Sequence, residues 1–136
     1  MATKAATAKL GLSDMYDELE RLLLKFAHHF TVRSGRVQDK RDCHLVSVRD
    51  VVISDRKYSE LSFASVIQQK DYIGFYYMPV YTVPELREQL PSPLLRMLKG
   101  KACFHVKDLT SDIHAAIEEA LAIGVNAYRQ NNWLEQ

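Results

Sequence analysis

The stretch from residue 70 to residue 109 constrains the fold most, because it concentrates aromatic, sulfur-containing and proline residues in one supersecondary unit. Residues 71–79, DYIGFYYMP, have the aromatic and β-branched character of a strand, which Pro79 ends. Pro84 and Pro93 each stand where a short helix would begin, and Gly100 occupies the position that closes the second helix. Residues 101–108, KACFHVKD, are predicted to form another strand. The unit is therefore predicted to run strand, helix, helix, strand.

A longer helix is expected on each side of this unit. Ser13, followed by acidic residues, predicts the start of an amphipathic helix that ends near Phe30. Thr110 or Ser111 is placed to cap a long C-terminal helix. The apolar faces of these helices supply four predicted core residues: Leu22, Phe26, Ile117 and Leu121.

Four β-branched or aromatic runs precede the first short helix, at residues 31–37, 44–53, 58–69 and 71–79. Their connections are too short for crossover helices, so the strands are predicted to be antiparallel. Residues 33–42 alternate basic and acidic side chains and are expected to form a charged hairpin. The predicted fold is an α+β two-layer sandwich, with about five antiparallel strands and the N- and C-terminal helices packed on one face. We expect residues 13–134 to form a single domain after a flexible tail at residues 1–12.

Composition limits the class of protein. The chain has 136 residues, is 47% hydrophobic and 26% charged, and contains no apolar run long enough to span a membrane. Its first residues do not resemble a secretory signal. Cys43 and Cys103 have no CxxC spacing, which favours reduced thiols and a cytoplasmic location. The net charge of +1 predicts neither nucleic acid nor a membrane as a partner.

Common catalytic motifs are missing from the sequence. It has no GxxxxGK[ST] or GxGxxG phosphate loop, no GxSxG elbow and no HExxH pair. This absence counts against nucleotide-dependent and hydrolytic enzymes. We therefore expect a protein that is not an enzyme, with no catalytic residue and no cofactor.

Two segments carry a family resemblance: residues 74–81, GFYYMPVY, and residues 92–109, SPLLRMLKGKACFHVKDL, followed by a capped helix. They resemble the uncharacterised family called "domain of unknown function 1801", most strongly over residues 70–129. Lys99, Gly100, Lys101, Cys103 and Phe104 match the family's pattern, whereas Ala102 replaces its usual small hydroxyl residue. The resemblance implies an α+β fold without an assigned activity, and one branch of the family is connected with frataxin-like iron handling.

Strand alternation divides the residues of this unit between two faces. Phe104 and Val106 are apolar, so they are expected to meet the helices together with Ile73 and Phe75. The opposite face then carries a mixed set of aromatic, sulfur and imidazole side chains, which suits a pocket or a partner surface. The residues predicted to bind a small molecule or a protein are Tyr72, Tyr76, Met78, Cys103 and His105.

Metal handling is the alternative function. Cys103 and His105 stand two apart on one strand and could share an iron or zinc ion, although zinc needs three or four protein ligands. The acidic first helix, with Asp14, Asp17, Glu18 and Glu20, offers another set of donors. The leading prediction is a binding module without catalytic activity, whose partner is a small molecule or a protein. The sequence is also compatible with a homodimer.

Overall fold

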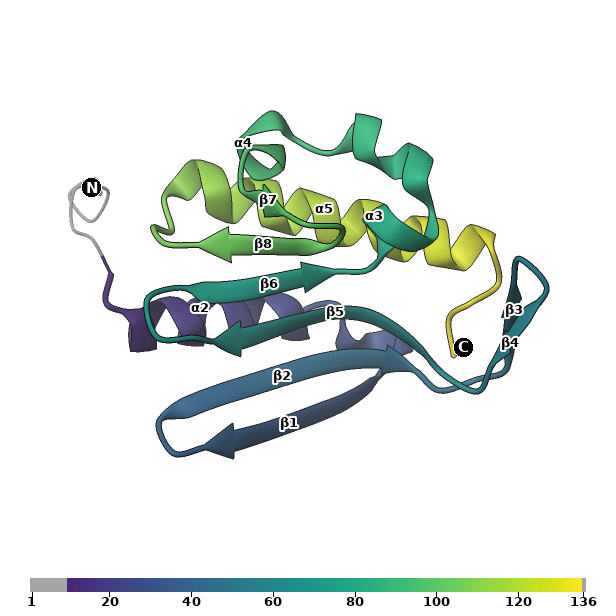
Figure 1. The fold of residues 1–136 in the computed structure, drawn as a ribbon, viewed down its shortest axis with the longest axis horizontal. Coiled ribbons are helices and arrows are strands. Elements are labelled where there is room, and N and C mark those ends of the chain that lie inside the picture. The colour runs from purple at the N-terminus through teal and green to yellow at the C-terminus, as the bar shows by residue number, and fades with distance from the viewer. Residues whose placement is uncertain (1–9, 136) are drawn as a thin grey trace.

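The fold is described by a computed structural model that covers residues 10–135 (Figure 1). Within these residues, six strands form one antiparallel sheet in the order β1-β2-β5-β6-β8-β7. The strands are β1 (Thr31–Val37), β2 (Lys40–Ser47), β5 (Leu61–Gln68), β6 (Ile73–Tyr77), β7 (Leu98–Lys99) and β8 (Cys103–Val106). A separate two-stranded hairpin is made by β3 (Val51–Ile53) and β4 (Arg56–Tyr58).

The helices form the second layer. Helix α2 (Leu12–Leu24) and helix α5 (Ser111–Gln130) lie behind the sheet in Figure 1, and among the described helices none crosses in front of β2, β5 or β6. Shorter helical segments join the main elements: η1 (Ala27–His29), α3 (Pro79–Thr82), η2 (Pro84–Gln89) and α4 (Ser92–Leu95). The predicted α+β class, with the terminal helices against the sheet, is confirmed. The sheet has one strand more than predicted, and the hairpin is additional.

The core lies between the sheet and the two long helices. The strand residues assigned to this face are fully buried, as are three of the four predicted helix residues: Ile73, Phe75, Phe104, Val106, Leu22, Ile117 and Leu121. Phe26 is only half-buried and packs against the edge of the core. It lies in the turn after α2, since the helix ends at Leu24 rather than near Phe30.

The start of α2 also differs from the prediction. Gly11 occupies the N-cap position in place of Ser13, and the helix begins at Leu12. Ser13 instead accepts a hydrogen bond from Arg41 of β2, whose guanidinium also pairs with Asp17 at 2.7 Å. Helix α5 is capped as expected, because the Thr110 side chain accepts from the backbone N–H of Ile113.

The second short helix ends earlier than the sequence indicates. Helix α4 stops at Leu95, and Leu98 pairs with Phe104 as part of β7. Gly100, predicted to close the helix, lies in the turn between β7 and β8 with a φ of 72°. The predicted strand at residues 44–53 is divided, because β2 ends at Ser47 and β3 begins at Val51.

The C-terminal segment returns to the sheet. The Glu135 carboxylate accepts from Thr31 Oγ1 and from the backbone N–H of Val48, each at 2.7 Å. Arg49 donates to the carbonyl of Leu134 at 2.8 Å. Of the predicted tail at residues 1–12, residues 1–9 lie outside the described part of the chain. Among the described helices, none has the length and hydrophobicity needed to cross a membrane.

Candidate functional site on the open face of the sheet

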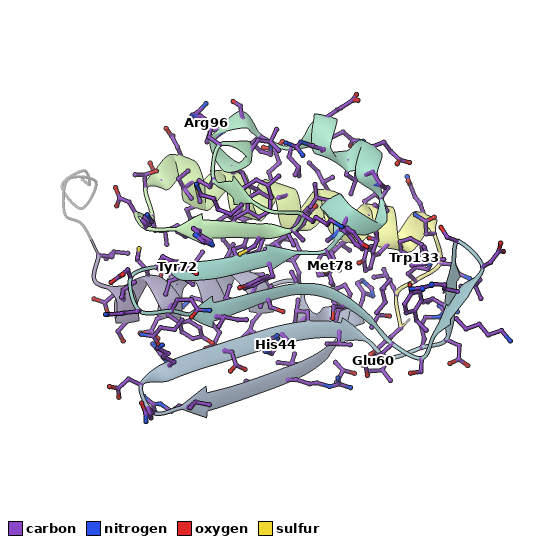
Figure 2. The ribbon with its side chains drawn as sticks, in the orientation of Figure 1. His44, Glu60, Tyr72, Met78, Arg96 and Trp133 are labelled. Carbon is purple, nitrogen blue, oxygen red and sulfur yellow. The ribbon has the colours of Figure 1, made fainter. Side chains whose placement is uncertain are left out.

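No helix of the described residues covers one face of the six-stranded sheet, and we call this face the open face. Its strand register places six side chains in one transverse row, one from each strand. Successive pairings across the sheet join Arg33, His44, Ser65, Tyr76, Cys103 and Lys99. Figure 2 shows His44 on the side of β2 that is turned away from the helices. Because the row consists of polar and ionisable groups, this face differs in chemistry from the apolar face beneath it.

Aromatic rings pack against one another and against the backbone on the open face. The rings of Tyr72 and His105 stack with centroids 4.0 Å apart and an interplanar angle of 20°. Tyr76 leans over Gly74, since a Cβ added to Gly74 would stand 2.9 Å from Tyr76 Cε1. A glycine at position 74 therefore allows the tyrosine ring to rest against the backbone.

Tyr76 also interacts with Cys103 on the neighbouring strand. A hydrogen bond with Cys103, together with partial burial, raises the pKa of Tyr76 to about 12. Burial raises the pKa of the Cys103 thiol as well. Thiolate is the reactive form of cysteine, so a raised pKa makes Cys103 a poor nucleophile at neutral pH.

Three residues of the open face form a hydrogen-bonded trio. His44 Nδ1 lies 2.7 Å from Ser65 Oγ, and His44 Nε2 lies 3.0 Å from Asp42 Oδ1. Asp42 and His44 share a face of β2, and Ser65 lies directly opposite His44 on β5. In this arrangement the Ser65 hydroxyl can donate to Nδ1 while the Nε2–H group donates to the carboxylate.

The trio contains the residue types of a hydrolase triad but not the surroundings that hydrolysis needs. An acyl transfer site requires backbone N–H groups aimed at a developing oxyanion. Ser65 lies in the middle of β5, which is paired with β2 on one side and with β6 on the other. The backbone near Ser65 therefore belongs to the ladders, and the trio suits a fixed polar surface.

A cleft adjoins the open face where β8 ends. Its volume is about 460 Å³, and His105 belongs to its wall. Its apolar lining comes from Pro93, Met97 and Ile113, and its charged lining from Arg96, Lys107, Asp108 and Asp112. These four charged side chains form no ion pair with another described residue.

The residues predicted from the sequence are only partly brought together. Tyr72, Tyr76, Cys103 and His105 lie on adjoining positions of β6, its preceding turn and β8. Met78 does not continue the strand: it precedes α3 with helical backbone angles, so strand alternation no longer sets its direction. The sequence reasoning missed the Asp42–His44–Ser65 trio and the cleft. The alternation of Asp42 and His44 was a visible signal, but Ser65 joins them only through the strand register.

The predicted metal ligands are not brought together into one site among residues 10–135. Cys103 and His105 supply two ligands, and the part of the chain described contains no group of three or more His, Cys, Asp or Glu residues placed to hold a metal ion. In α2, Glu18 pairs with Arg21 and Asp17 pairs with Arg41. Both carboxylates are thus engaged with arginine.

Comparison with known proteins adds no relative, since no family model, curated protein or solved structure matches the chain. The resemblance described from the sequence therefore stays a prediction.

Proposed function

We propose that the protein is a binding module without catalytic activity, and that it recognises a small anionic molecule carrying an aromatic ring. The observation that carries this proposal is the position of His105, which lines the cleft and also stacks on Tyr72. A ligand in the cleft would therefore meet both the charged lining and the aromatic surface of the open face. Pockets for small ligands commonly combine an apolar wall with a few polar groups that set orientation.

The charge of the cleft favours an anion. Asp112 lies in the first turn of α5, where the partial positive charge of the helix N-terminus compensates its carboxylate. Of the other charged lining residues, Arg96 and Lys107 are basic and Asp108 is acidic, and His105 adds a donor on the same wall. A carboxylate or phosphate group can pair with Arg96 and Lys107 through charge-assisted hydrogen bonds.

The chemistry of the nearby side chains supports binding over catalysis. The Cys103 thiol has a raised pKa, and Ser65 lies within paired strands. Cys103 is therefore not activated as a nucleophile. Ser65 lies next to His44, but the backbone N–H groups around it are not free to form an oxyanion hole.

The first test is a titration of the ¹⁵N-labelled protein with 4-hydroxyphenylacetate, indole-3-acetate and phenyl phosphate. We expect at least one of them to shift the amide resonances of Met97, His105 and Ile113. Replacing Lys107 by Gln removes a charge-assisted hydrogen bond and should weaken that binding about tenfold or more. Lys57→Gln, on the β3–β4 hairpin, is the matched control and should leave the affinity unchanged.

Two results would contradict the proposed ligand class. Absence of shifts at the cleft with all three anions would remove the proposal. Equal affinity for the neutral methyl ester of 4-hydroxyphenylacetate would show that the anionic group is not recognised. Ferrous iron and zinc are titrated in parallel, and a stoichiometric, EDTA-reversible stabilisation would favour the metal-handling alternative.

A protein partner on the open face is the second candidate function, favoured by the Tyr72 and Tyr76 rings on that face. Tyr76 is half-buried, so Tyr76→Arg should leave the melting temperature nearly unchanged while removing a partner that packs there. Tyr81→Arg, at a tyrosine that is 53% exposed and lies outside this face, is the control. A large loss of stability in Tyr76→Arg would show that the residue belongs to the packed interior.

A further inference from the structure

Strand β1 forms an edge of the sheet that lacks the usual protection. Among the strands of residues 10–135 it pairs only with β2, and residues 32–37 are all exposed. The opposite edge is different, because β7 has only two residues. In Figure 1, β1 lies at the lower border of the molecule, while β7 lies next to α4 near the upper border. An exposed edge presents unpaired N–H and C=O groups to any strand that approaches it.

Natural proteins block such edges with short strands, proline, bulges or free charged side chains. The strand β1 contains no proline, and its register with β2 is unbroken over seven residue pairs. The irregularity of this sheet lies elsewhere, between β2 and β5 at Leu45 and Val46. Strand β1 is thus long and regular.

The two arginines of β1 are held by neighbouring groups. Both terminal nitrogens of Arg33 donate to the Glu60 carboxylate at 2.9 Å, and Arg36 Nε donates to the Gln38 carbonyl at 3.1 Å. The Glu60 carboxylate offsets the positive charge of Arg33. Arg33 therefore repels basic side chains of an approaching strand less than an unpaired arginine would. The strand also carries two exposed valines: Val32 is 43% exposed and Val37 is 71% exposed.

We propose that a second copy of this chain occupies the edge, with the two β1 strands antiparallel around a two-fold axis at Ser34. A two-fold axis perpendicular to the sheet places one residue opposite its own counterpart. An axis at Arg33 or Arg36 would oppose identical charges, which destabilises a strand pair. An axis at Ser34 pairs all seven residues of β1. It sets Arg33 opposite Gly35, which has no side chain, and Arg36 opposite Val32.

This pairing joins the two sheets edge to edge and extends the open face across both copies. It is independent of the ligand proposed for the cleft, because β1 and the end of β8 lie at opposite sides of the sheet. Failure of either proposal therefore leaves the other standing.

The test measures the solution mass of the full chain by sedimentation over a range of concentrations. We expect a concentration-dependent dimer. Ser34→Lys would set two lysines directly opposite each other and should weaken association about fivefold or more. An equimolar mixture of Ser34→Lys and Ser34→Glu should restore it, because the opposed charges then attract. The control is Val52→Lys, which places the same charge at an exposed position of β3 and should dimerise like the parent.

Cross-linking tests the register itself. Ser34→Cys should form an intermolecular disulfide under mild oxidation much faster than Ser111→Cys, an exposed serine at the start of α5. Circular dichroism confirms that each variant is folded. A parent protein that stays monomeric at all concentrations would overturn the proposal, as would equal cross-linking rates at positions 34 and 111.

Discussion

At the scale of single residues, the two buried glycines define close approaches that no side chain could occupy without movement. Gly74 allows Tyr76 to rest on the open face. Gly124 faces the interior from α5, and a Cβ there would stand 2.8 Å from Tyr77 Oη and 2.9 Å from Phe63 Cε1. The helix lies this near the sheet because position 124 has no side chain.

Gly124→Ala is expected to destabilise the protein although alanine is the better helix former. The gain in helix propensity is about 1 kcal/mol, whereas overpacking a filled core costs about 1–3 kcal/mol. The added methyl group also meets Pro79 Cγ at 2.9 Å, so several neighbours would have to shift together. A lower melting temperature checks this expectation. Asn126→Ala, at an exposed position of the same helix, isolates the propensity effect and should be neutral or stabilising.

At the scale of elements, helix α2 binds the sheet through one apolar stripe. Its buried residues are Met15, Tyr16, Leu19, Leu22 and Leu23. The opposite side of the helix is exposed at Leu24, and Lys25 just after it pairs with Glu118 of α5 at 3.1 Å. The stripe, more than this exposed ion pair, holds α2 in place, because such pairs contribute at most about 1 kcal/mol.

Leu22→Asp tests the stripe directly. Leu22 is 1% exposed, so the variant would bury an unpaired carboxylate and should lose about 3 kcal/mol or more of unfolding free energy. Leu24→Asp, two residues away and 41% exposed, should change stability little. Urea unfolding of the two variants makes the comparison. Similar losses in both would show that the stripe is misassigned.

The elements also show which features a sequence can predict. Strands β6 and β8 alternate apolar and polar side chains, and their two faces could be assigned correctly from that period alone. Strand β7 could not be predicted, because two residues carry no period and only their pairing with Phe104 defines the strand. The trio required still more. Ser65 lies opposite His44 because of the register between β2 and β5, which also contains a bulge at Leu45 and Val46. Neither the register nor the bulge can be recognised in the local sequence of one strand.

At the scale of the whole molecule, tyrosine hydroxyls tie helix α5 and the sheet together. Tyr77 of β6 donates to the carbonyl of Ala120 at 2.5 Å, and Tyr128 of α5 donates to the carbonyl of Ser62 at 2.8 Å. Both bonds join residues more than forty positions apart in the chain. Each needs a protonated phenol, since only the neutral side chain has a proton to donate.

Stability is therefore expected to fall in alkaline solution. Burial raises the pKa of Tyr77 and of Tyr128 above the ordinary value of 10.0, so above that pH the unfolded chain releases protons that the folded chain retains. The unfolding free energy should then fall as pH rises, by up to about 1.4 kcal/mol per pH unit for each such group. Burial also raises the pKa of Cys43 from its ordinary value of 9.0 to about 11. Cys43 therefore adds to the fall in unfolding free energy at pH values above about 9.

Urea unfolding at a series of pH values from about 8 to about 11 measures this slope. Tyr77→Phe removes one titrating group, so its unfolding free energy should decline less steeply with pH than that of the parent, even though the lost hydrogen bond makes it less stable at neutral pH by about 1 kcal/mol. Tyr81→Phe, at a tyrosine that is 53% exposed, should keep the slope of the parent. An unchanged slope in Tyr77→Phe would mean that the buried phenol does not stay protonated in the folded protein, and the link between α5 and the sheet would have to be explained by packing alone.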